Sequence, residues 1–113
     1  MARVDDIFNA LLDAAPKAFG DAWGQVKVFL PAEARKLAVE LESIAENVAA
    51  FELDNTKGYP PETGKVLLRM QKRATETVLM AVTALTLLAV EETLNAVLNA
   101  ARNVIGDIVD SVV

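Results

Sequence analysis

The residues in this sequence that could support metal chemistry are glutamates at helical spacings. In di-iron bundles, inward-facing glutamates hold two metal ions, and two of the helices also supply a Glu-x-x-His motif. The chain contains no histidine, so it cannot form a site of that kind. The acidic residues compared with such a site are Glu33, Glu40, Glu46, Glu76, Glu91 and Glu92.

A site built from carboxylates alone would suit a hard cation such as magnesium, calcium or manganese. Glutamates at helical spacing with lysines nearby ordinarily form a solvated face that makes salt bridges. We adopt this second interpretation and expect no metal, no cofactor and no catalytic residue. The chain also lacks cysteine, so Ser-His and Cys-His catalysis are both excluded. We therefore expect a protein that is not an enzyme, with a carboxylate-lined metal enzyme as a distant alternative.

Composition and charge limit the class of partner. The chain has 113 residues, of which 53% are hydrophobic, and a formal net charge of −5. Nucleic acid is bound through clustered lysine and arginine, so an acidic chain argues against that partner. The same charge opposes adsorption to anionic membranes. Because Asp5 and Asp6 stand where a secretion signal would be basic and then apolar, we expect a cytoplasmic location, or a virion-internal one if the protein comes from a phage.

The longest uncharged segment runs from Thr77 to Val90, between Glu76 and Glu91. A helix that is apolar on nearly all sides must be covered by protein or by lipid. At about 1.5 Å per residue, residues 77–90 extend about 21 Å, which is shorter than a hydrocarbon core of about 30 Å. We therefore favour a buried core helix over a membrane span.

A separate, regular apolar repeat lies earlier in the chain. Between residues 30 and 51 the apolar positions are spaced alternately by four and three residues, which is typical of the a/d seam of a helix packed lengthwise on a partner. The repeat is the most specific pattern in the sequence. The residues of this intrachain seam are Leu30, Ala34, Leu37, Leu41, Ile44, Val48 and Phe51.

Prolines and glycine predict the element boundaries within a single all-α domain over residues 1–113. Pro16 and Pro31 are expected to bend or break the early helices, or to be the first residue of a new helix. Gly58 and the Pro60-Pro61 pair predict a chain reversal. No proline follows Pro61. The expected elements are proline-bounded helices at 1–30, a seam helix at 31–54, a loop at 55–61 and a long C-terminal helix at 62–113.

The chain reversal predicts an antiparallel helical hairpin or bundle. Residues whose numbers sum to about 117 would then lie opposite each other, which brings basic residues level with acidic ones. The expected interhelix ion pairs join Glu42, Glu46 and Glu52 to Arg69, Lys72 and Arg73.

The C-terminal helix carries more apolar surface than one partner helix can cover. Either the chain bends at Pro16 and Pro31 and folds back into a compact bundle of four or five helices, or copies of the hairpin associate. We favour association and expect oligomerisation to complete the fold. We expect the protein to be a self-associating, non-enzymatic component of a larger assembly. Its expected partner is a second copy of the same chain, and a different protein is the alternative partner. The alternative is a lipid-associating protein that exposes Val78 to Val90 at a bilayer. The expected oligomer interface consists of Val78, Val82, Leu85, Leu94, Leu98, Ile105 and Ile108.

Overall fold

The computed structural model describes residues 2–83 and 85–100, and every regular element in this part of the chain is a helix. The helices are α1 (Ala2–Phe19), the 3-10 turn η1 (Gly20–Ala22), α2 (Trp23–Val26), α3 (Leu30–Leu53), α4 (Pro61–Val82) and α5 (Leu87–Ala100). The all-α fold class predicted from the sequence is confirmed.

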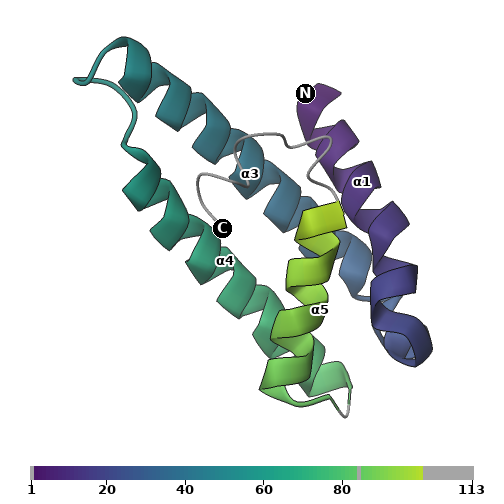
Figure 1. Ribbon diagram of the computed structural model, residues 1–113. Helices are drawn as coiled ribbons and strands as arrows, with labels where there is room; N and C mark the ends of the chain where they lie inside the picture. Colours follow the sequence, from purple (N-terminus) through teal and green to yellow (C-terminus); the bar gives the residue numbers. More distant parts are fainter. Residues whose placement is uncertain (1, 84, 101–113) are drawn as a thin grey trace.

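The four long helices pack against one another in an up-down-up-down arrangement (Figure 1). α1 packs on α3, α3 on α4, α4 on α5, and α5 returns to α1, so the helices close a ring. Short connections favour antiparallel neighbours of this kind. The α3–α4 hairpin is longer than the other two helices, and its tip projects at the upper left of Figure 1.

The core lies inside this ring and receives aliphatic side chains from all four long helices. α1 contributes every third or fourth residue, which is the spacing of one helix face. The largest fully buried side chains are Ile7, Leu11, Val26, Leu37, Leu41, Ile44, Leu68, Leu79, Val90, Leu94 and Leu98.

Pro16 neither breaks the first helix nor starts a new one, which leaves a bend among the outcomes expected from the sequence. It lies inside α1, which continues to Phe19, and the helix ends only where Gly20 adopts a positive φ of 56°. Glycine reaches this left-handed conformation without a Cβ clash, so it commonly ends helices. Pro31 lies in the first turn of α3, where its missing N–H has no intrahelical partner to lose.

The turn between α3 and α4 is held to α3 by its backbone. The amide of Tyr59 donates to the carbonyl oxygen of Asn47 at 3.3 Å. Gly58 has a φ of 61°, and a Cβ at this position would overlap the same carbonyl group. Asp54 closes the start of the turn, because its Oδ1 accepts from the Thr56 amide at 3.0 Å and from its hydroxyl at 2.7 Å.

The single long helix expected over residues 62–113 is wrong, because α4 ends at Val82 and α5 begins at Leu87. Threonine hydroxyls satisfy the backbone on both sides of the break. Thr83 donates to the carbonyl oxygen of Leu79 at 2.8 Å, and the Thr86 hydroxyl accepts from the amide of Ala89 at 3.2 Å. The second bond is an N-cap, which lets a new helix start without glycine or proline.

Candidate functional site

The seam residues on α3 face the core. Leu30, Ala34, Leu37, Leu41 and Ile44 are buried, whereas Val48 and Phe51 near the hairpin tip are half-buried. The difference follows the shape of the molecule, because the tip projects beyond the ring of four helices (Figure 1).

The structure places two residues of the expected oligomer interface inside the protein's own core. Leu94 is 1% exposed and Leu98 is 0% exposed. Val78, Val82 and Leu85 are half-buried. Ile105 and Ile108 lie outside the described residues. Leu94 and Leu98 therefore offer no surface to a second copy.

The physical reason is the chain break after α4. A straight helix would carry residues 87–100 away from α1, whereas the break between Val82 and Leu87 lets α5 return and pack on α1 and α4. One copy thus covers Leu94 and Leu98 with its own helices, and the premise that a second copy must cover this part of the C-terminal region is wrong.

The structure does not bring the expected interhelix ion pairs together. The described residues form two ion pairs, Arg35 with Asp5 and Lys36 with Glu33, each at 3.0 Å. Glu42, Glu46 and Glu52 take part in neither. On α4, Lys72 turns toward α5 instead, where its Nζ donates to Oδ1 of Asn95 at 2.6 Å.

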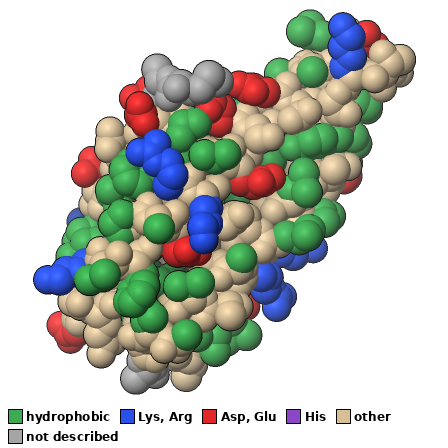
Figure 2. Space-filling view, turned by 180° about the vertical axis from the view of Figure 1, so that it is seen from behind, with side chains coloured by type: hydrophobic (Ala, Val, Ile, Leu, Met, Phe, Trp, Pro, Cys, Tyr) green, Lys and Arg blue, Asp and Glu red, His purple; other side chains and the backbone are tan. Residues whose placement is uncertain are grey.

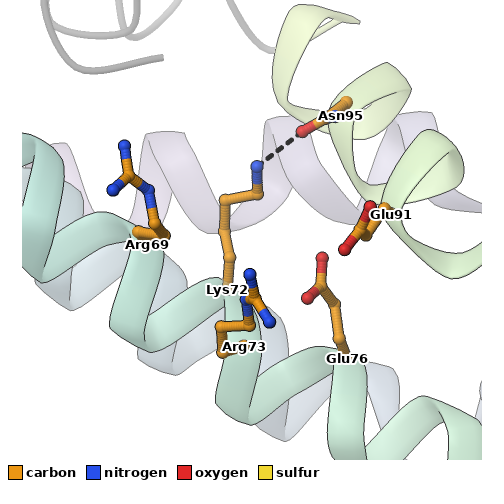
Figure 3. A pocket seen from close by; sticks show the side chains of 6 residues that line it. All are labelled: Arg69, Lys72, Arg73, Glu76, Glu91 and Asn95. Carbon is orange, nitrogen blue, oxygen red and sulfur yellow. Dashed lines mark hydrogen bonds between the residues drawn. The ribbon is translucent and has the colours of Figure 1, made fainter. Parts of the chain in front are cut away.

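Arg69, Lys72 and Arg73 therefore line a different feature, an open cleft between α4 and α5 with a volume of about 210 Å³. One helical turn further along α4, Glu76 also lines the cleft, and α5 supplies its opposite wall. Figure 3 shows the arginine and lysine side chains toward one end and two carboxylates at the other. The six lining residues are Arg69, Lys72, Arg73, Glu76, Glu91 and Asn95.

The acidic end of this cleft consists of one buried and one half-buried carboxylate. Glu76 is only 3% exposed, and its carboxylate points toward that of Glu91 (Figure 3). Burial raises the pKa of Glu76 above its ordinary value, and the charge of Glu91 raises this pKa further, while Lys72 and Arg73 partly oppose the shift. The ionised form of this carboxyl group is therefore disfavoured relative to that of an exposed glutamate.

Sequence reasoning named both glutamates but did not pair them. The two residues flank the uncharged segment 77–90, so they would lie about four helical turns apart on one straight helix. The break at residues 83–86 reverses the chain and brings them face to face. The sequence feature that indicates a helix break here is the pair Thr83 and Thr86, because threonine is a good N-cap and a weak helix former.

A second candidate site is the solvent-facing side of α4, opposite its buried side. Val66 is 51% exposed and Met70 is 63% exposed, and Met80 is also exposed. Hydrophobic side chains of this kind run along the projecting hairpin on the rear side of the molecule, with charged groups between them (Figure 2). We define the outer α4 face as the exposed residues Val66, Met70, Ala74, Thr77, Met80 and Ala81.

Among the described residues, no helix is long and apolar enough to cross a membrane, and no group of acidic side chains is arranged to hold a metal ion. Comparison with protein families, with curated proteins and with solved structures gave no match.

Proposed function

We propose that this protein is a non-enzymatic helical protein that self-associates and acts as a structural or interaction component of a larger assembly. The observation that supports the proposal most is the apolar character of the outer α4 face. A monomer exposes isolated apolar side chains without consequence, but a row of them along one helix is typical of an interaction site.

The spacing of this row supports helix-to-helix contact. Val66, Met70, Ala74, Thr77 and Ala81 follow one another by four, four, three and four residues, so they form one stripe along α4. A second helix can pack lengthwise along a stripe with this spacing. The partner that we propose is α4 of a second copy.

Charge supports that choice of partner. In an antiparallel pairing of α4 with α4 about a two-fold axis between Val66 and Met70, each Val66 lies opposite the Met70 of the other copy. The same pairing brings Glu62 of one copy close to Arg73 of the other. In an isologous contact each interaction occurs twice. The dimer would therefore contain two Val66–Met70 contacts and two Glu62–Arg73 pairs. Arg73 makes no ion pair within the described part of one copy.

The experiment compares two valines of equal exposure. Val66 on α4 and Val39 on α3 are each 51% exposed, so neither Val66→Asp nor Val39→Asp buries a charge in the monomer. The mass by light scattering should fall toward the monomer for Val66→Asp and stay as in the wild type for Val39→Asp. Equal masses for all three proteins would contradict the assigned interface.

The same measurement with neutral liposomes tests the lipid-associating alternative. The segment Val78 to Val90 contains the buried residues Leu79 and Val90, so exposing it at a bilayer would require α4 and α5 to separate. Liposome binding with loss of the oligomer would favour the alternative over self-association.

A further inference from the structure

The cleft between α4 and α5 separates opposite charges along its length. Arg69, Lys72 and Arg73 lie within about one helical turn of α4, and Glu76 and Glu91 close the other end (Figure 3). At 1.5 Å per residue, Arg73 and Glu76 are about 4.5 Å apart along the helix axis. A ligand that contacts both ends must therefore carry two opposite charges a short distance apart.

Glu76 gives the clearest sign that this cleft is a binding site. The residue is 3% exposed and makes no hydrogen bond or ion pair with a described residue, although its carboxylate oxygens remain accessible from the cleft. Among the described residues, the buried side-chain oxygens without a partner are the hydroxyls of Tyr59 and Thr75, so a ligand in the cleft can reach the Glu76 carboxylate. The carboxylate points into the cleft, where a ligand would supply that partner (Figure 3).

The opposite end offers unused donors. Arg69 and Arg73 form no ion pair among the described residues, and each guanidinium carries donors that match the geometry of phosphate or carboxylate. Lys72 is already oriented, because its Nζ donates to Asn95. A tetrahedral anion with several oxygen atoms could accept from all three cationic side chains.

The volume of the cleft and the charge of its lining residues limit the class of ligand further. The cleft measures about 210 Å³, below the range of about 300 to 1,000 Å³ that is usual for drug-sized ligands. Three cationic and two acidic side chains line it, so a ligand with one net negative charge would neutralise it. A phosphate monoester carries a charge of about −1.5 to −2 at pH 7, and one ammonium group on the same molecule brings the total to about −0.5 to −1.

We propose that the α4–α5 cleft binds a small phosphorylated amine, with its ammonium group between Glu76 and Glu91 and its phosphate on Arg69, Lys72 and Arg73. The ammonium donates to the two carboxylates and removes their mutual repulsion. The phosphate oxygens accept from the guanidinium and ammonium groups of α4. This binding site shares Arg73 with the self-association proposed above, but Glu76 faces the cleft and is not part of the outer α4 face.

Titration calorimetry with the full-length protein tests the ligand class. The probes are O-phosphoethanolamine, inorganic phosphate and ethylamine, which carry both charged groups, the anion alone and the cation alone. Since a hydrogen bond to a charged group contributes roughly 1.5–3 kcal/mol, O-phosphoethanolamine should bind at least about tenfold more tightly than either half. Phosphate binding as tightly as O-phosphoethanolamine, or no binding of O-phosphoethanolamine, would overturn the proposal.

Two variants with matched controls locate the binding site. Glu76→Gln and Arg69→Gln should each weaken O-phosphoethanolamine binding by about tenfold or more. Glu92→Gln and Lys65→Gln change exposed residues that do not line the cleft, so they should bind as the wild type does. Loss of affinity in the controls that equals the loss in Glu76→Gln and Arg69→Gln would show a nonspecific charge effect and overturn the proposal.

The ammonium–phosphate pair also occurs in the headgroup of phosphatidylethanolamine, so the ligand could be a free metabolite or a lipid. Cosedimentation with vesicles of phosphatidylcholine, with and without phosphatidylethanolamine, distinguishes the two sources. Binding that requires phosphatidylethanolamine and is displaced by O-phosphoethanolamine would assign the lipid to this cleft. Calorimetric binding of O-phosphoethanolamine without vesicle binding would assign the free compound.

Discussion

The carboxylate of Glu76 on α4 faces the carboxylate of Glu91 on α5 across an open cleft (Figure 3). The two residues are separated in sequence by the uncharged segment 77–90, and the turn after Val82 brings them together. Like charges at this position make the folded state sensitive to pH, because one of the two carboxylates is buried.

Glu76→Gln should stabilise the protein at neutral pH. Burial first, and the charge of Glu91 second, raise the pKa of Glu76 above its ordinary value of 4.5. The folded state therefore holds this proton more tightly than the unfolded state does. Stability from Glu76 is complete below about pH 4.5 and is lost as the pH rises through the higher folded-state pKa. Glutamine stays uncharged, so the variant avoids this loss.

The check is chemical denaturation of Glu76→Gln, Glu92→Gln and the wild type at about pH 4 and about pH 7. The advantage of Glu76→Gln should be present at the higher pH and small at the lower one. Glu92→Gln, which changes an exposed residue on α5, should show no comparable advantage. An advantage of Glu76→Gln that is equal at both pH values would refute the assigned cause.

Leu98→Ala should destabilise the monomer, because Leu98 is fully buried between α5 and its neighbours. Truncation of a buried leucine to alanine costs roughly 2–5 kcal/mol of unfolding free energy. Leu88→Ala makes the same change on the same helix at a residue that is 63% exposed, and surface changes usually stay within about 0.5 kcal/mol. Urea denaturation measures both, and equal small losses would show that α5 does not pack as described.

Gly58→Ala should lower the free energy of unfolding by roughly 1–3 kcal/mol, because alanine is strained at a positive φ. Its Cβ would also overlap the carbonyl group of Asn47. Gly24→Ala is the control, since a Cβ at Gly24 meets no atom within 4 Å. Thermal denaturation should show a lower midpoint for Gly58→Ala and none of that loss for Gly24→Ala.

Thr86→Ala should cost roughly 0.5–2 kcal/mol, as expected for the loss of an N-cap hydroxyl. The bond at risk joins the Thr86 hydroxyl to the amide of Ala89 at the start of α5. Thr77→Ala removes a hydroxyl that donates to a carbonyl oxygen inside α4, where alanine is the better helix former. If both variants unfold at the same denaturant concentration, the helix does not begin at this cap.

The sequence predicted the helical class and the chain reversal because both depend on local, one-dimensional patterns. The seam spacing on α3 is visible from Leu30 onward, and Gly58 with Pro60 and Pro61 marks the turn. The route of the chain after Val82 was not visible in the same way. A run of aliphatic residues favours a continuous helix, and the local signal for a break is limited to Thr83 and Thr86. Tertiary packing of α5 on α1 and α4 also favours the break.

The cleft depends on that break and could not be predicted for the same reason. The sequence indicates the basic residues of the cleft wall, but the hairpin register predicts Glu42, Glu46 and Glu52 as the facing acids. These residues belong to α3, whereas α5 supplies the actual facing wall through Glu91 and Asn95. The pairing register of a two-helix hairpin does not include α5. It therefore places the basic residues of α4 opposite acidic residues of α3, whereas α5 lies opposite them in the structure.

Self-association is tested most directly by the solution mass of the wild-type protein over a concentration series. One chain has a mass of 12.1 kDa. Because association obeys mass action, the mass from light scattering should rise to at least about twice that value as concentration increases by about a hundredfold. A mass that stays at 12.1 kDa across the whole series would contradict the account.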